Sequence, residues 1–177
     1  MNARDMRQLS LQYSFPFKFF ELLQFGGRLI LEEPAPFAQV FARIKELNLF
    51  ELSQFYQKHS NRSDDQFANY VTGLINGHDY TQIHFTDLAK DYDFTTDLYD
   101  DTTPYWKSTP RYIDPRTMHE GLQAVVTRHV SGSAEIFRLN APLAGKQGPV
   151  AIWEDLQHYL CIDYSQKAIQ LITSGFD

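Results

Sequence analysis

Residues 158–173 decide the fold class of this chain of 177 residues, and they read His-Tyr-Leu-Cys-Ile-Asp-Tyr-Ser-Gln-Lys-Ala-Ile-Gln-Leu-Ile-Thr. Two segments rich in aliphatic and aromatic residues, His158–Tyr164 and Ala168–Thr173, flank the short polar sequence Ser165-Gln166-Lys167. Two such segments joined by a tight turn are typical of neighbouring antiparallel strands. The sequence therefore predicts a β-hairpin close to the C-terminus.

More strand-like segments precede this hairpin. Leu122–Val130 and Ala134–Leu139 flank Ser131-Gly132-Ser133, which is a three-residue hairpin signal containing glycine. Pro149–Trp153 is a further short candidate strand. The second half of the chain thus predicts an antiparallel meander of about four to five strands.

The first half carries mainly helix signals. Pro36 suits a first helical turn, and apolar residues follow through Leu47 at the spacing of one buried face. Beyond Leu47 the sequence leaves two alternatives open, a break near Asn48 or one continuous helix within residues 36–58. Asp64–Asn76 combines a capping box, an apolar stripe and a glycine after its end. Three shorter helices are predicted at 17–25, at 86–92 with Thr86 as the cap, and at 115–121.

Short strands are predicted at 9–15, where apolar and polar residues alternate, and at 80–85. Residues 102–115 hold three prolines and predict a loop. The fold class that follows is α+β over residues 1–177, with a helical N-terminal half packed on one face of a C-terminal antiparallel sheet.

Composition limits the classes of function. With 16 basic and 22 acidic residues the net charge is −6, which disfavours a nucleic-acid ligand because phosphate binding needs a cationic surface. The single Cys161 excludes an intramolecular disulfide. No stretch is long and apolar enough for a membrane span, so we expect a cytoplasmic protein that needs neither membrane nor cofactor.

The charge is concentrated in one segment. Asp87–Asp101 contains six Asp and one Lys, a balance of −5, whereas residues 1–86 have eight basic and nine acidic side chains and residues 102–177 have seven of each. The carboxylates alternate with aromatic rings, a combination that suits the binding of a basic protein. The expected partner-binding residues are Asp91, Tyr92, Asp93, Phe94, Asp97, Tyr99, Asp100, Asp101, Tyr105 and Trp106.

This segment favours an inhibitor or immunity-type protein that neutralises a basic partner. The alternative for a charge run is a solvated loop that keeps the protein soluble. A calcium loop is a weaker alternative, because the glycine of the sharp turn and the closing Glu are both missing, so no metal site is predicted.

A second hypothesis is enzymatic. Ile83-His84-Phe85-Thr86 and Arg128-His129-Val130-Ser131 are two His-x-Thr/Ser units. Two facing units of this kind could act as general base and general acid on a phosphoester. The pair resembles the two-histidine phosphoesterases over eight residues, and the resemblance implies catalytic roles for His84, Thr86, His129 and Ser131. The 45 residues between the units are fewer than is usual in that family.

A third hypothesis is a structural subunit of a larger assembly, with the aromatic segment Tyr13–Phe25 as its docking surface. The sequence leaves open the partner's identity, the substrate of any enzyme and the oligomeric state.

Overall fold

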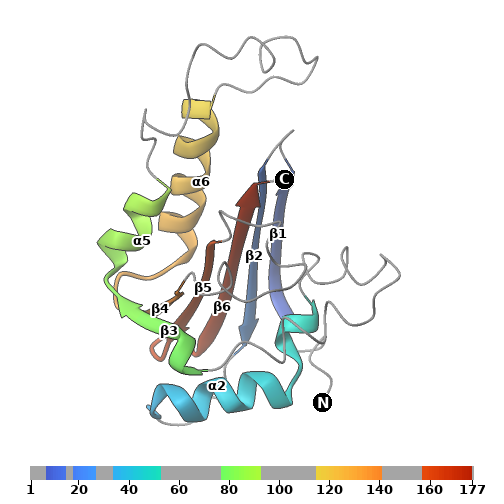
Figure 1. The fold of residues 1–177 in the computed structure, drawn as a ribbon, viewed down its shortest axis with the longest axis vertical. Helices are drawn as coiled ribbons and strands as arrows, with labels where there is room; N and C mark the ends of the chain where they lie inside the picture. The colour runs from blue at the N-terminus through green and yellow to red at the C-terminus, as the bar shows by residue number, and fades with distance from the viewer. Residues whose placement is uncertain are drawn as a thin grey trace.

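The structure is a computed structural model, and it describes residues 7–14, 18–26, 34–52, 77–92, 115–140 and 157–176 (Figure 1). Its strands form one six-stranded sheet in the order β1-β2-β6-β5-β4-β3, and every neighbouring pair is antiparallel. The strands are β1 Arg7–Ser14, β2 Lys18–Gly26, β3 Tyr80–Ile83, β4 Glu135–Leu139, β5 Gln157–Asp163 and β6 Ala168–Phe176. The N-terminal hairpin β1–β2 joins the C-terminal strands through β6.

Helices pack on both faces of this sheet (Figure 1). The described helices are α2 Phe37–Glu46, α5 Phe85–Asp91 and α6 Pro115–His129, with two short 3₁₀ turns, η2 Leu49–Leu52 and η3 Gly77–Asp79. One core cluster contains buried residues of α2 and η2, and the other contains buried residues of α5 and α6. We call the two sides of the sheet the α2 face and the α5/α6 face.

Strand β2 explains why both faces are covered. Its side chains alternate between the two cores: Phe20 and Leu22 belong to the α5/α6 face, and Leu23 and Phe25 belong to the α2 face. All four are fully buried. A strand that is apolar on both sides needs a layer on each side to exclude water.

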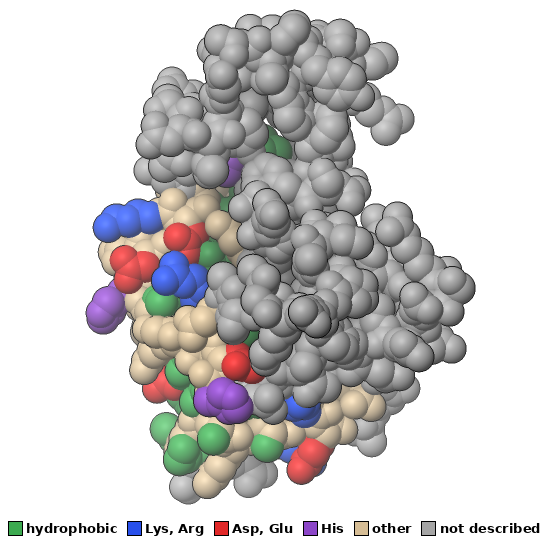
Figure 2. Space-filling model, viewed as in Figure 1, with side chains coloured by type: hydrophobic (Ala, Val, Ile, Leu, Met, Phe, Trp, Pro, Cys, Tyr) green, Lys and Arg blue, Asp and Glu red, His purple; other side chains and the backbone are tan. Residues whose placement is uncertain are grey.

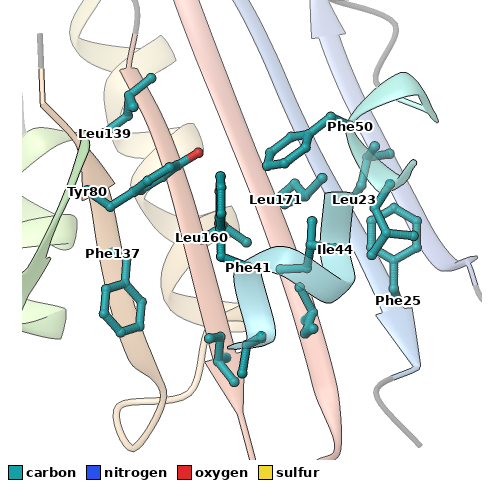
Figure 3. Close-up of a cluster of buried hydrophobic side chains, with 14 residues drawn as sticks. Leu23, Phe25, Phe41, Ile44, Phe50, Tyr80, Phe137, Leu139, Leu160 and Leu171 are labelled. Atoms are coloured by element: carbon teal, nitrogen blue, oxygen red, sulfur yellow. The ribbon is translucent and has the colours of Figure 1, made fainter. Parts of the chain in front are cut away.

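Aromatic and aliphatic side chains pack helix α2 onto its face of the sheet, and Figure 3 shows Phe41 and Ile44 of the helix within this cluster. The Phe37 ring stacks on Phe137 of β4 with the ring centroids 3.8 Å apart, while Phe41 and Ile44 are buried one and two turns later. The helix ends before Asn48, whose φ of 53° lies in the left-handed region that stops a helix. The predicted helix is confirmed, and of the two alternatives at Asn48 the structure shows the break.

Several other sequence predictions are confirmed. Strand β1 covers most of the predicted 9–15, and β3 and β4 coincide closely with the predicted strands. Strands β5 and β6 are joined by the tight turn Tyr164–Lys167. Helix α5 begins after His84 rather than at a Thr86 cap, so its predicted start is two residues late.

The predicted helix at 17–25 is wrong, because these residues form strand β2. A strand that is buried on both sides has a run of apolar residues that is hard to distinguish from the apolar face of a helix when only the sequence is known. Here β2 lies between β1 and β6, so the hydrogen bonds of a central strand replace those of a helix.

The predicted strand at 122–130 is also wrong. Helix α6 does not end at Gly121 but continues to His129, and residues 131–133 join it to β4 instead of turning a hairpin. Buried Met118, Leu122 and Val126 recur every four residues along its inner side. The pair Val125-Val126 favoured a strand by propensity alone, and the packing of α6 on the sheet overrides that weak preference.

The α+β class is confirmed, whereas the finer architecture needs correction. The sheet has six strands rather than four to five, and β1, β2 and β3 all come from the first half of the chain. Helices lie on both faces rather than one. The predicted helix 64–76, the loop 102–115 and the strand 149–153 fall mainly or wholly outside the described residues.

Within the part of the chain that the structure describes, no helix has the length and apolar character needed to cross a membrane.

Candidate functional site at the end of helix α5

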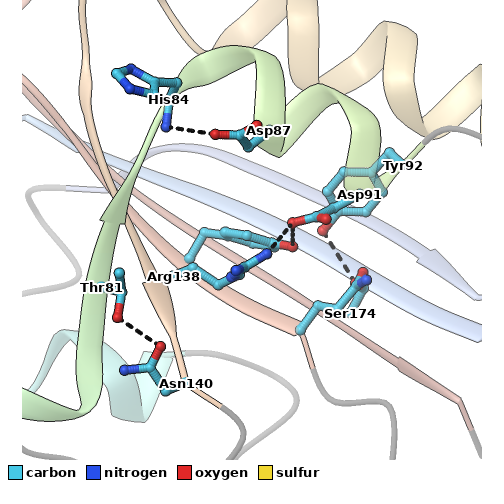
Figure 4. Close-up of polar contacts among 10 residues, drawn as sticks. Thr81, His84, Asp87, Asp91, Tyr92, Arg138, Asn140 and Ser174 are labelled. Atoms are coloured by element: carbon cyan, nitrogen blue, oxygen red, sulfur yellow. Dashed lines mark hydrogen bonds and ion pairs between the residues drawn. The ribbon is translucent and has the colours of Figure 1, made fainter.

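The carboxylate of Asp91 is the centre of a polar cluster where α5 ends (Figure 4). Its Oδ2 accepts a 2.6 Å hydrogen bond from the Tyr159 hydroxyl and a 3.4 Å contact from Arg138 Nη1. Tyr159 of β5 and Arg138 of β4 are directly opposite one another in the sheet. The register of two strands therefore brings both donors to one carboxylate oxygen.

The next residue, Tyr92, turns into the interior. Its ring is fully buried and meets Phe20 edge-on at a centroid distance of 5.6 Å. Its hydroxyl lies 3.2 Å from Ser174 Oγ, which in turn donates to Gln157 Oε1 at 3.0 Å. Burial raises the pKa of Tyr92, so the phenol stays protonated and can donate to Ser174.

Tyr159 is likewise held in its protonated form. Burial is the main reason that its pKa is raised, followed by the neighbouring Tyr92 and by Asp91, whose carboxylate the protonated hydroxyl bonds. An un-ionised phenol is the donor that a carboxylate needs. The Asp91–Tyr159 hydrogen bond therefore persists across the neutral pH range.

Acidic and basic side chains lie next to one another over the region of α5 in the space-filling view (Figure 2). The side chain of Asp91 is 24% exposed and that of Arg138 is 45% exposed. The chain leaves the described part after Tyr92 and returns at Pro115, and both α5 and α6 pack on the α5/α6 face. The two ends of the connection that carries most of the acidic segment are thus fixed on one side of the sheet.

Of the ten expected partner-binding residues the structure describes two. Asp91 is partly exposed and hydrogen-bonded, whereas Tyr92 is a core residue whose ring offers no outer surface. Asp87, which also belongs to the acidic segment, accepts a 3.3 Å hydrogen bond from the backbone N–H of His84 and caps α5. The remaining eight residues lie outside the described part: Asp93, Phe94, Asp97, Tyr99, Asp100, Asp101, Tyr105 and Trp106.

The two His-x-Thr/Ser units lie at opposite ends of their helices. His84 and Thr86 are exposed at the start of α5, and His129 and Ser131 are half-buried at and just beyond the end of α6. The register pair Ile83–Ile136 places the end of β3 beside the beginning of β4, so both units belong to the same corner of the sheet.

The described contacts do not join these units into one site. Ser131 Oγ lies 2.8 Å from Ser133 Oγ and accepts the Ser133 backbone N–H at 3.2 Å, so its hydroxyl supports the loop before β4. Burial and the neighbouring Arg128 lower the pKa of His129. No hydrogen bond between described residues connects one unit with the other.

The third expected surface, Tyr13–Phe25, is largely internal where the structure describes it. Phe20, Leu22, Leu23 and Phe25 are fully buried between the layers, and Tyr13 is 38% exposed. Of the three rings in this segment whose side chains the structure describes, Phe20 and Phe25 are core residues of β2 and Tyr13 is exposed.

Sequence reasoning missed a polar row on the α2 face. Strand register aligns Gln12, Glu21, Thr173 and His158 across four neighbouring strands. Gln12 Nε2 donates to Glu21 Oε1 at 2.9 Å, and His158 Nδ1 lies 3.0 Å from Thr173 Oγ1. Burial lowers the pKa of His158 to about 4, so this imidazole is neutral at pH 7.

Sequence reasoning also missed Arg138 and Tyr159. The only signal in the sequence was one charged residue inside Ile136-Phe137-Arg138-Leu139, which shows a strand with a partly open face but not its partner. Among the described residues no group of three or more His, Cys, Asp or Glu side chains could hold a metal ion.

Comparisons of the chain with models of known protein families, with curated proteins and with solved structures found no match.

Proposed function

We propose that this protein is a non-catalytic binding module, an acidic inhibitor or immunity-type protein that binds and neutralises a basic partner protein. The observation that carries the proposal is the balance of −5 within Asp87–Asp101, out of a net charge of −6 for the whole chain. A localised negative field accelerates the encounter with a cationic surface and selects against acidic partners.

The anchoring of the acidic segment supports this proposal. Asp91 and Tyr92 attach its beginning to the sheet through Tyr159 and Ser174. Residues held in place in the free protein lose less conformational freedom when a partner binds, so the anchoring of Asp91 favours affinity at this position.

The phosphoesterase hypothesis has less support. Its catalytic arrangement needs two hydroxyl groups that are available to a phosphate, and the Ser131 hydroxyl is engaged within its own loop. Phosphoester hydrolysis that is lost in His84→Ala and His129→Ala would nevertheless favour the enzyme over the binding module.

The binding proposal is tested by neutralising the acidic segment. The variant changes Asp91, Asp93, Asp97, Asp100 and Asp101 to Asn, and the matched control changes five carboxylates elsewhere, Glu32, Glu33, Glu46, Asp64 and Asp65, to their amides. Both lose five negative charges. We expect a basic protein that is captured by the wild type and by the control at low salt, but not by the Asn variant.

Capture of the same partner by all three proteins, unchanged between low and high salt, would contradict the proposal. Circular dichroism and thermal unfolding of each variant establish that a loss of capture does not come from a loss of fold.

A further inference from the structure

We propose that Asp91 is a direct contact for a cationic side chain of the partner, and that Arg138 occupies the place of that cation in the free protein. The inference rests on the proposed function and assigns a specific role to one ion pair within it. It concerns a partner that presents Arg or Lys.

Tyr159 holds the Asp91 carboxylate in a fixed position. The hydrogen bond from its hydroxyl to Oδ2 is 2.6 Å long, which is typical of a strong O–H to carboxylate contact. The Tyr159 ring itself is fully buried, so its hydroxyl keeps its position when a partner binds. Asp91 is therefore orientated before any partner arrives.

The contact with Arg138 is much weaker. A single guanidinium nitrogen lies 3.4 Å from Oδ2, longer than a good charge-assisted hydrogen bond and without the second contact of a bidentate pair. Both side chains reach water, Arg138 at 45% exposure and Asp91, which is partly covered, at 24%. Exposed pairs of this kind contribute little stability, so an external cation can replace Arg138 at a low cost.

A guanidinium that replaces Arg138 can contact both oxygens of Asp91, whereas Arg138 contacts Oδ2 alone. The described residues place no hydrogen bond on Oδ1, and a guanidinium or ammonium needs one such acceptor. Asp87, one turn earlier on α5, differs because its carboxylate accepts from the His84 backbone and serves the helix itself. The structure thus gives different roles to two carboxylates that lie one turn apart on the same helix.

A double-mutant cycle tests this role. Binding of a fluorescently labelled hexa-arginine peptide is measured by anisotropy for the wild type, Arg138→Gln, Asp91→Asn and the double variant. The matched control is Arg43→Gln, which removes an arginine of similar exposure from an ion pair with Glu46 on α2, with the same change in net charge.

We expect Arg138→Gln to bind the peptide about threefold more tightly than Arg43→Gln at about 50 mM salt, since vacating a weak ion pair is worth a factor of this order. In the Asp91→Asn background, the gain in peptide affinity from Arg138→Gln should fall to the gain that Arg43→Gln gives. Arg138→Met, which keeps the aliphatic stem, repeats the measurement if the Gln variant folds poorly.

Equal gains from Arg138→Gln and Arg43→Gln, or a gain that survives in Asp91→Asn, would overturn the assignment of Asp91 while leaving the binding module intact. A wild-type protein that binds the peptide no better than the five-Asn variant at low salt would overturn the proposed function itself, and this inference with it.

Discussion

The Tyr159 hydroxyl donates a 2.6 Å hydrogen bond to Asp91 Oδ2 and so joins the end of helix α5 to the centre of the sheet. Asp91 and Tyr159 are 68 residues apart in the sequence. The contact, together with burial of Tyr92 in the following position, fixes the end of α5 on the sheet. The contribution of the Tyr159–Asp91 hydrogen bond to stability can be measured separately from any binding activity.

Tyr159→Phe should lower the free energy of unfolding by about 2 kcal/mol, because a hydrogen bond to a charged acceptor is lost without a change in ring packing. Tyr164→Phe is the matched control, since the Tyr164 hydroxyl donates to the neutral carbonyl of Ala35 at 3.1 Å. Its cost should stay near or below about 1 kcal/mol. Urea denaturation of both variants makes the comparison, and equal losses would show that the charge on Asp91 adds nothing.

The buried His158 should make the fold sensitive to acid. Its pKa is about 4 in the folded protein against an ordinary value of 6.5, so the unfolded chain binds the proton more readily between these two pH values. Above pH 6.5 the His158 imidazole therefore leaves the free energy of unfolding unchanged, and as the pH falls below 6.5 it lowers that free energy. By pH 4 the loss approaches about 3 kcal/mol, from about 1.4 kcal/mol for each pH unit.

Unfolding free energies measured from pH 7.5 to pH 4 for the wild type and His158→Gln test this sensitivity. In His158→Gln the unfolding free energy should fall much less below pH 6.5 than in the wild type. His78→Gln, which replaces an exposed histidine, should show the same fall as the wild type. A decline of the same size in His158→Gln would assign the acid sensitivity to other groups.

Gly121→Ala should stabilise the protein by about 1 kcal/mol, which is the difference between these residues inside a helix. Gly121 lies within α6 and is exposed, and an added Cβ would meet no atom within 4 Å. Ala124→Gly, at an exposed position of the same helix, should cost a similar amount. Thermal unfolding measures both, and a destabilised Gly121→Ala would mean that the helix ends there, as the sequence first suggested.

Lys167→Gly should stabilise the β5–β6 turn. Lys167 has a φ of 50°, a left-handed conformation in which a side chain costs about 1 to 2 kcal/mol, partly offset by the greater freedom of glycine in the unfolded chain. The expected net gain is about 0.5 to 1 kcal/mol. Gln166→Gly, where φ is negative, should instead be neutral or destabilising, and the reverse order in urea denaturation would contradict the argument.

Elements with a complete local signal were predictable. Helix α2 has a proline before its first turn, a single apolar face and a residue suited to the left-handed region after its end. The β5–β6 hairpin has two strand-forming segments around a short turn. In these stretches propensity, periodicity and turn chemistry agree, so no information from distant residues was needed.

The candidate site was predictable only in part. The sequence located the negative charge, and it identified Asp91 as one member of a larger set. It did not indicate that Tyr92 would be buried or that Tyr159 and Arg138 would contact Asp91, because those contacts depend on the register of β4 against β5 and on where α5 lies above them.

The sequence by itself determined the mixed α+β class, the position of the charge, and the elements whose residues agree locally. Only the tertiary structure decided that residues 18–26 form a central strand, that α6 is one long helix, and that helices cover both faces of the sheet. The physical reason is that an apolar segment takes the conformation that buries it best, and the surfaces available for burial come from residues far away in the chain.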